Sequence, residues 1–267
     1  MTAIAGFFLA ASVVVFVWQA FVGVVCGIAF VIASACVVNN VLDRHIDTRM
    51  KRTAKRSVAS GHIRRRNALL FAAMLGGIGF GLLALLTNGL TLLLGVVAYG
   101  WYIVVYGFAK RTTPFSTIIG GVPGALPPVA GYTALTGQLD VAALALFLIL
   151  FFWQLPHFYA ISMFRRDDYA AASLPVWSVR YGMKSTRRHI LIAAICYGLA
   201  ALLLVFTGYV GVVYAVASTA LSVYWLATGI RRYRRDSDVI WAKAMFGVSL
   251  LVLLAMSGLI AIGGFVA

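Results

Sequence analysis

The sequence contains no glutamate, and its 267 residues carry only seven acidic side chains, all of them aspartate. Only 11% of the residues are charged, whereas a typical soluble domain has about 25%. So few polar residues cannot cover a water-soluble globule, and an apolar fraction of 63% excludes a disordered chain. Long unbroken apolar runs replace the alternation that a transmembrane barrel requires. The composition is therefore typical of a polytopic, all-α membrane protein.

Cysteine is also scarce, and the three cysteines lie inside apolar runs without the spacing of a metal site. We interpret Cys26, Cys36 and Cys196 as small packing residues. The N-terminal stretch has neither the basic region nor the small-residue cleavage site of a secretory signal, and it lacks the arginines of a mitochondrial transit peptide. We therefore expect a multi-pass protein of the bacterial plasma (inner) membrane.

A spanning helix needs about 20 apolar residues, and the runs between turn signals predict nine transmembrane helices around a central cavity. The nine candidates are residues 3–17, 20–41, 67–86, 90–108, 115–135, 141–161, 189–207, 209–229 and 244–265. The first of them is short for a span. No hydrophilic domain or long linker interrupts the series, so residues 1–267 are predicted to form a single transmembrane domain.

All 22 lysines and arginines fall in four of the connections between these spans, 43–66, 109–114, 162–188 and 230–243. Basic residues accumulate in cytoplasmic loops, so we expect a cytoplasmic N-terminus and a C-terminus outside. The same rule accounts for the net charge of +15, and no nucleic-acid partner is expected. Segments 43–66 and 162–188 are long for simple connections and are predicted to be functional cytoplasmic loops.

Three polar side chains, Asn39, Asp43 and Asp47, follow one another at intervals of four residues where the second span ends. If the helix continues, they share one face. Two carboxylates one turn apart repel each other, and Mg²⁺, which binds through carboxylates and substrate phosphates, would remove that repulsion. The basic residues downstream would neutralise a diphosphate. The alternative is a solvated loop with local ion pairs, which leaves Asn39 without a role.

A second polar group lies where the sixth span ends. Pro156 is expected to break or kink the helix, which would aim Gln154 and His157 into a cavity. Asp167 and Asp168 follow in the next loop and could supply a second acidic site. The alternatives are a hydrogen-bonded interior histidine and an ordinary ion-paired loop.

The span 115–135 is rich in glycine and proline, which is typical of close helix packing or of a broken helix that lines a cavity. Lys110 and Arg111 at its mouth could hold a phosphate. The alternative is helix packing combined with charges that only set the topology.

Three stretches, 36–56, 110–137 and 153–175, carry a resemblance to a known family. They read C-x-x-N-N-x-x-D-R-x-x-D-x-x-M-x-R-T-x-x-R, K-R-x-T-P with G-A-x-P-P, and W-Q-x-P-H with F-R-x-x-D-Y. The sequence resembles the UbiA-type intramembrane prenyltransferases over nearly its whole length, and more closely their protoheme IX farnesyltransferase (heme O synthase) branch. The second acidic motif has a single aspartate, Asp168, because Ala172 stands four residues later. That form favours the heme branch.

The resemblance implies transfer of a farnesyl group from farnesyl diphosphate to the 2-vinyl group of protoheme IX (heme B). The products are heme O and diphosphate. The implied cofactor is Mg²⁺, and its implied ligands are Asn39, Asp43, Asp47 and Asp168, of which the three aspartates are the catalytic residues. The residues implied to bind the diphosphate are Asn39, Arg52, Lys110 and Arg165. Those implied to bind heme are His157 and Gln154.

Two other functions stay open on the sequence alone. One is prenyl transfer to a quinone-ring or chlorophyll-type acceptor. The other is a small membrane transporter, with the Gly- and Pro-rich span as its site. Transport predicts inverted repeats and charges at the midplane, and neither is found. The expected partners are the lipid bilayer and a downstream heme A synthase or terminal oxidase assembly, with the active site facing the cytoplasm.

Overall fold

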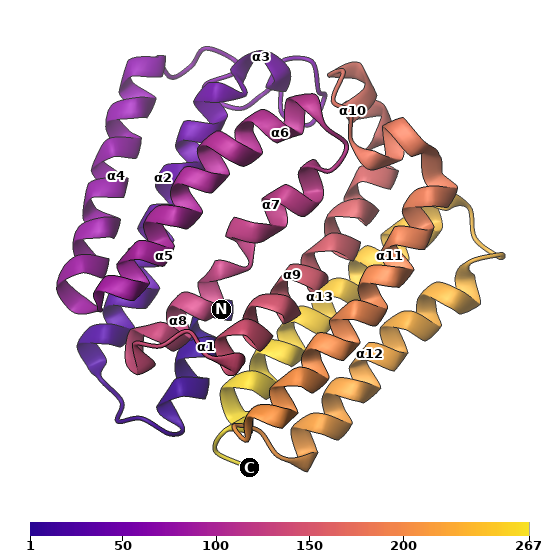
Figure 1. The fold of residues 1–267 in the computed structure, drawn as a ribbon. Coiled ribbons are helices and arrows are strands. Elements are labelled where there is room, and N and C mark those ends of the chain that lie inside the picture. Colours follow the sequence, from indigo (N-terminus) through magenta and orange to yellow (C-terminus); the bar gives the residue numbers. More distant parts are fainter. Residues whose placement is uncertain (267) are drawn as a thin grey trace.

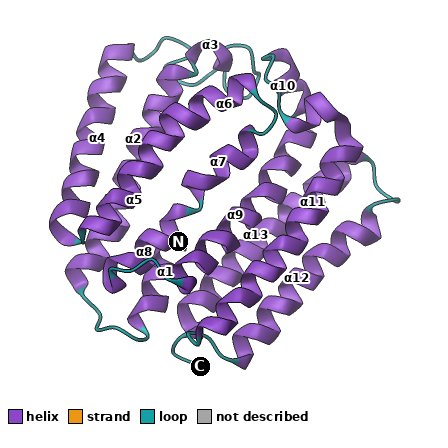
Figure 2. Ribbon diagram, in the orientation of Figure 1, coloured by secondary structure: helices purple, strands orange, loops and turns teal. Residues whose placement is uncertain are grey.

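A computed structural model of the protein describes residues 1–266. Over this range the chain forms helices and no strands (Figure 2). The elements in chain order are α1 (Thr2–Ala11), α2 (Trp18–Leu42), α3 (Arg44–Asp47), α4 (Arg65–Leu86), α5 (Gly89–Gly100), the π-helix η1 (Trp101–Tyr106), α6 (Gly107–Thr112), α7 (Ser116–Gly124), α8 (Leu126–Thr136), α9 (Val141–Phe164), α10 (Arg166–Ala171), α11 (Trp177–Leu203), the 3₁₀ turn η2 (Leu204–Thr207), α12 (Val212–Arg232) and α13 (Asp238–Gly263).

Eight helical segments of 21 to 31 residues among the described residues are long and apolar enough to cross a membrane. The protein is therefore a multi-pass membrane protein, as predicted. The first expected span, 3–17, contains only the ten-residue helix α1, about half of the length that a crossing requires. The count of nine and the orientation of the two termini stay predictions.

The short helix α1 belongs to the interior of the bundle, where Phe7 and Leu9 are fully buried. Two glycines allow its backbone to approach α8 closely. A Cβ atom on Gly6 would lie 2.0 Å from the carbonyl oxygen of Pro128, and one on Gly131 would lie 1.9 Å from that of Ala3. The packing expected of a Gly- and Pro-rich span is confirmed at these positions.

The turn signals of the sequence lie where helices end. The side chain of Asn88 caps α5 by accepting a hydrogen bond of 2.9 Å from the Thr91 N–H, and Asp140 caps α9 in the same way through Ala143. Gly137 ends α8 with φ 64°, a left-handed conformation that glycine adopts without steric cost.

Two expectations about helix ends need correction. The predicted loop 162–188 is too long, because α9 continues to Phe164 and α11 begins at Trp177, with a kink at Gly182 (φ 79°). Pro156 lies inside the continuous helix α9, so the helix is not broken there, whereas the kink that was the other expectation stays a prediction. A proline removes one backbone hydrogen bond of the helix. In contrast, span 115–135 is broken, at Ala125, as its composition indicated.

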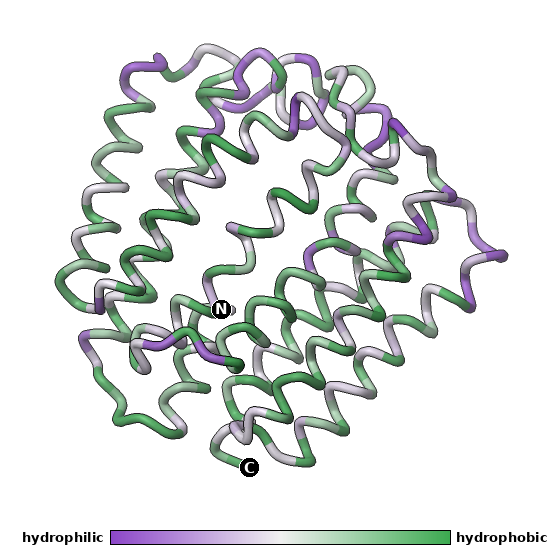
Figure 3. The backbone as a smooth tube through the Cα atoms, viewed as in Figure 1, coloured by the Kyte–Doolittle hydropathy of each residue, from purple (hydrophilic) through white to green (hydrophobic). Residues whose placement is uncertain are grey.

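The helices run side by side as a bundle, and the hydrophilic segments gather mainly at one end (Figures 1 and 3). The short helices α3 and α10, which come from the two long connections, lie at that end (Figure 1). The middle of the bundle is predominantly hydrophobic, as a protein in contact with lipid requires.

Candidate functional site

A cavity of about 550 Å³ extends along α2, between this helix, the α5–η1–α6 segment, α7, α8 and α9. Its polar end is lined by Asn39, Asp43 and Asp47, and its other end by apolar side chains that include Ile28 and Leu83. Ile28 and Asp43 are about 22 Å apart along α2 from the helical rise per residue. The cavity is thus long, with charge at one end only.

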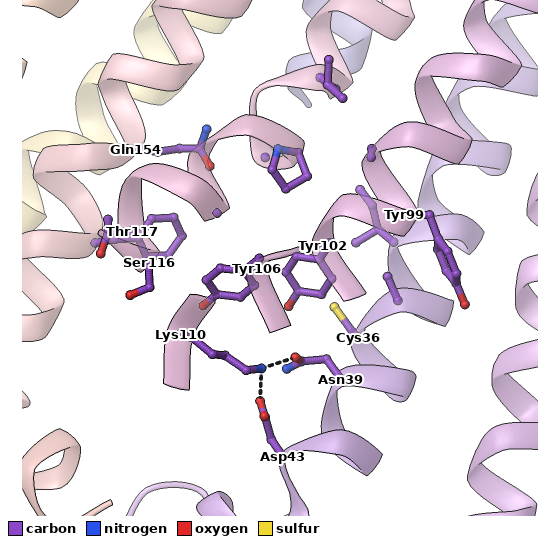
Figure 4. A pocket seen from close by; sticks show the side chains of 18 of the residues that line it. Cys36, Asn39, Asp43, Tyr99, Tyr102, Tyr106, Lys110, Ser116, Thr117 and Gln154 are labelled. Atoms are coloured by element: carbon purple, nitrogen blue, oxygen red, sulfur yellow. Dashed lines mark hydrogen bonds and ion pairs between the residues drawn. The ribbon is translucent and has the colours of Figure 1, made fainter. Parts of the chain in front are cut away.

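Asp43 lies at the end of α2 and is only 8% exposed. The Lys110 ammonium on α6 donates to Asn39 Oδ1 and to Asp43 Oδ2, each at 2.5 Å (Figure 4). Arg111 donates to Asp43 Oδ1 at 3.1 Å and to the Leu42 carbonyl oxygen at 2.9 Å. Two cations at the end of α6 therefore balance the negative charge of the Asp43 carboxylate at the end of α2.

Asp47 is even less exposed, at 1%, and lies at the end of α3. Arg56 Nη1 donates to both of its carboxylate oxygens, at 3.1 and 3.0 Å, and Thr53 Oγ1 donates to its carbonyl oxygen at 3.0 Å. The Asp43 N–H bonds to the Asn39 carbonyl oxygen and the Asp47 N–H to that of Asp43, both at 2.8 Å. The shared helical face predicted for these three residues is confirmed.

The cavity wall opposite Asn39 is formed by the π-helix η1. A run of six π-helical residues is rare, and such wide turns are frequent at functional sites. It holds Tyr102 and Tyr106 as a stacked pair, with ring centroids 5.4 Å apart (Figure 4). Gly120 of α7 leaves room for this wall, because a Cβ atom there would lie 2.7 Å from the Tyr106 ring.

Of the two residues expected to contact heme, Gln154 lines the cavity and is 5% exposed. Its Nε2 donates to the carbonyl oxygens of Gly121, at 3.3 Å, and Leu150, at 3.1 Å. Figure 4 shows Gln154 across the cavity from the acidic end.

His157 is not among the residues that line the cavity. It faces α13, where Nδ1 shares a 2.8 Å hydrogen bond with the Ser249 hydroxyl. Its ring packs against Trp153 and Phe246, with centroid distances of 4.8 and 4.7 Å. The structure therefore does not bring His157 together with Gln154 in one cavity wall, and its contact with heme stays a prediction.

The second acidic loop contributes less to the cavity than the first. Asp168 pairs with Arg165 at 3.9 Å, and neither residue lines the cavity. Arg52 and Tyr169 do line it. Burial raises the pKa of the Tyr169 phenol above its usual 10.0, so this hydroxyl is neutral and can donate a hydrogen bond at neutral pH.

A metal site would rest on the first acidic group. Within residues 1–266 no three His, Cys, Asp or Glu side chains come together as metal ligands, so Asp168 does not join Asp43 and Asp47. The oxygens of Asn39, Asp43 and Asp47 nevertheless suit Mg²⁺, which takes one or two carboxylates and completes its shell with water and substrate phosphates. The Lys110 ammonium donates to two of these oxygens, Asn39 Oδ1 and Asp43 Oδ2, and so already places a positive charge beside them.

Sequence reasoning assigned no role to Arg56, Tyr102, Tyr106 or Tyr169. The sequence signal for Tyr102 and Tyr106 is a four-residue spacing, 102, 106 and 110, which parallels that of 39, 43 and 47, and Tyr169 is the last residue of the F-R-x-x-D-Y motif. The assembled site combines a buried carboxylate pair, several cations and a long apolar cavity. Such a site can hold a molecule with an anionic, metal-binding head and a long hydrocarbon tail.

Comparisons with known proteins agree with this geometry. Residues 1–259 match the model of the UbiA prenyltransferase family. The chain is 42% identical over 233 residues to Protoheme IX farnesyltransferase 1 of Shewanella sp. (strain W3-18-1), across 86% of this chain and 74% of that protein.

Two solved structures share the fold. One is the apo structure of a UbiA homolog from Aeropyrum pernix K1, with a TM-score of 0.78, 19% identity, and coverage of 96% of this chain and 95% of that one. The other is a UbiA homolog from Archaeoglobus fulgidus bound to DMAPP and Mg²⁺, with a TM-score of 0.65, 16% identity, and coverage of 98% and 96%.

Proposed function

The chain belongs to the UbiA prenyltransferase family, and we propose that it transfers the farnesyl group of farnesyl diphosphate to the 2-vinyl group of protoheme IX, with release of diphosphate. The product is heme O. The observation that carries this proposal is the 42% identity, over 86% of the chain, to a protoheme IX farnesyltransferase. The cavity supports it, because its charged end and apolar body suit a prenyl diphosphate.

The diphosphate binds at the end of the cavity that holds the first acidic group. Asn39, Asp43 and Asp47 hold Mg²⁺, and Asp168 is a further candidate ligand from the second loop. When bound, Mg²⁺ neutralises charge on the leaving diphosphate as a Lewis acid. Solved UbiA homologs bound to DMAPP or GPP with Mg²⁺ support this assignment.

The protein's own cations complete the binding of the diphosphate. Lys110 and Arg52 line the cavity, and Arg165 lies in the adjoining loop. Fixed positive groups in a partly desolvated site stabilise the charge that grows on the diphosphate as its bond to the prenyl carbon breaks. Arg56 keeps the carboxylate of Asp47 in place, because its Nη1 donates to both carboxylate oxygens.

The aromatic wall stabilises the allylic cation that forms when this bond breaks. The Lys110 ammonium lies 5.3 Å from the centroid of the Tyr106 ring, so the face of this ring already receives a positive charge. A cation over an aromatic face gains about 0.5–2 kcal/mol, depending on how far it is desolvated. The apolar side chains around the prenyl chain exclude bulk water from the reactive cation.

The acceptor of the prenyl group is the heme. We assign Gln154, in the cavity wall, to contact with the vinyl edge of the heme and retain His157 as a second candidate for heme contact. The basic connections at one end of the bundle support an active site that faces the cytoplasm of a bacterial cell. Such a site would deliver its product to a heme A synthase or terminal oxidase assembly in the same membrane.

The test is expression of the chain in a bacterial host that lacks heme O synthase, followed by chromatography and mass spectrometry of the extracted hemes. We expect heme O from the parent chain. A matched Asp47→Asn variant that inserts equally well should give none. Absence of heme O from well-expressed, inserted parent protein would contradict the proposal. A farnesylated quinone found in its place would identify a different acceptor.

A further inference from the structure

One hydrogen-bond acceptor in the cavity wall has no protein donor. The amide of Gln154 is fixed through its nitrogen, which donates to the carbonyl oxygens of Gly121 and Leu150. Its oxygen Oε1 accepts no hydrogen bond from any residue that the structure describes. The side chain is 5% exposed and lines the cavity. An acceptor that faces the cavity without a protein donor favours a ligand or a water molecule that donates a hydrogen bond.

The surrounding backbone leaves space for this oxygen. A Cβ atom on Gly124 would lie 2.0 Å from Gln154 Oε1, so any residue other than glycine would displace the amide. The two bonds to Nε2 prevent an exchange of the amide nitrogen and oxygen, because an oxygen cannot donate to carbonyl groups. The two hydrogen bonds of Nε2 therefore fix the orientation of Oε1.

The reactants of the proposed function offer this acceptor few donors. The prenyl chain of farnesyl diphosphate has no O–H or N–H group, and the vinyl edge of an iron porphyrin has none. Water is the one reactant with O–H groups, since heme O carries a hydroxyl that neither organic reactant supplies. Ser116 and Thr117 line the same cavity and can give a bound water further partners.

The position of Gln154 is deeper in the cavity than the diphosphate end. Gly120 faces the Tyr106 ring, and Tyr106 lies one helical turn from Lys110. Gly124, which faces Oε1, lies one turn beyond Gly120 on α7, so Oε1 is about two turns deeper than Lys110. The acceptor therefore lies beyond the diphosphate, toward the apolar part of the cavity.

On the basis of the proposed function, we propose that Gln154 Oε1 holds the water molecule that adds to the vinyl-derived cation. The C–O bond to diphosphate breaks, and its electron pair leaves with the diphosphate. The vinyl π electrons form the new C–C bond to the prenyl carbon and leave a positive charge on the carbon attached to the ring. A lone pair of the held water forms the C–O bond there, and the released proton goes to the diphosphate.

The experiment compares the products of the parent chain, Gln154→Leu and Gly124→Ala in the host that lacks heme O synthase. Without the held water the cation loses a proton instead, and the product is an alkene lighter than heme O by the mass of one water. We expect the ratio of alkene to heme O to rise about tenfold in both variants, the effect of losing roughly one hydrogen bond. Gln138→Leu, outside the cavity, is the matched control and should keep the parent ratio.

The outcomes separate this inference from the function on which it rests. A parent ratio in both variants overturns the role of Gln154 and leaves heme farnesylation intact. Loss of both products from folded Gln154→Leu also overturns it, because the residue then acts before water addition. If Gln154→Leu does not accumulate, Gly124→Ala decides alone, since it keeps the amide and only displaces it. No heme O from the parent chain would contradict both proposals.

Discussion

The two long connections each carry a pair of aspartates with arginines nearby, yet the structure treats the two pairs differently. Asp43 and Asp47 are 8% and 1% exposed and pair with cations from other segments of the chain. Within residues 1–266, Asp168 pairs only with Arg165, three residues before it, at 3.9 Å. Similar local composition thus gives two different results. In the first loop the carboxylates are buried and form ion pairs with other segments of the chain, and in the second loop the ion pair is local and more solvated.

This difference indicates where function constrains the chain. Burying two carboxylates costs several kcal/mol per ion, and ion pairs often only offset that cost. A protein therefore retains such a group where binding requires it. In the second loop the Asp168 side chain is 16% exposed, close to the 11% of Asp43, but its partner Arg165 is 48% exposed and lies 3.9 Å away. Such a solvated pair contributes about 0–1 kcal/mol to stability.

The largest effect is expected at the first pair. Asp43→Asn and Asp47→Asn each keep size and shape but remove the charge that holds Mg²⁺, so we expect heme O production to fall by roughly 10²–10³ or more. The measurement is product formation per inserted protein. Asp167→Asn, in the second loop, serves as the control and should keep near-parent activity. Equal activity of all three variants would remove the distinction between the two loops.

A smaller effect is expected at the arginine that fixes Asp47. Arg56→Lys keeps the positive charge but replaces the planar guanidinium, whose Nη1 donates to both oxygens of Asp47, with a shorter side chain that ends in a tetrahedral ammonium. We expect the KM for farnesyl diphosphate to rise about tenfold, the value of one charge-assisted hydrogen bond. The exposed Arg49→Lys in the same loop is the matched control. An unchanged KM in Arg56→Lys would show that charge alone suffices at this position.

The second loop gives a sharper comparison through Asp168→Asn. Because this side chain lies outside the cavity and pairs only within its own loop, we expect less than a tenfold loss of activity. The measurement is the same product assay at saturating Mg²⁺. A loss as large as that of Asp47→Asn would mean that Asp168 joins the metal site when the substrates are bound.

Much of the fold could be predicted from the sequence, because its signals are local. Composition indicated the membrane class, and turn residues such as Asn88 and Gly137 marked helix ends. The loop 162–188 was overestimated because charged residues were taken to lie outside helices. Arg180 and Arg187 in fact lie in α11, whose first part is polar.

The site was only partly predictable, because rotation of a helix about its axis depends on tertiary packing. On α9 two stripes at four-residue spacing run side by side, 154 with 158 and 153 with 157. Only the first lines the cavity, and the second packs against α13. The spacing was visible in the sequence, whereas the choice between the two stripes was not. Arg56 was missed for a similar reason, since its partner Asp47 is reached only through the folded loop.

The smallest effect is expected at His157, on the stripe that faces α13. His157→Phe keeps an aromatic ring between Trp153 and Phe246 and removes the hydrogen bond to Ser249. The Ser249 hydroxyl keeps its 2.6 Å bond to the Phe246 carbonyl oxygen. We therefore expect a loss of about 1 kcal/mol in stability and activity within about twofold of the parent. Thermal unfolding in detergent and the heme O assay measure the two quantities. Loss of heme binding at unchanged thermal stability would instead assign His157 to the heme, as its sequence motif suggested, and would place the acceptor between α9 and α13.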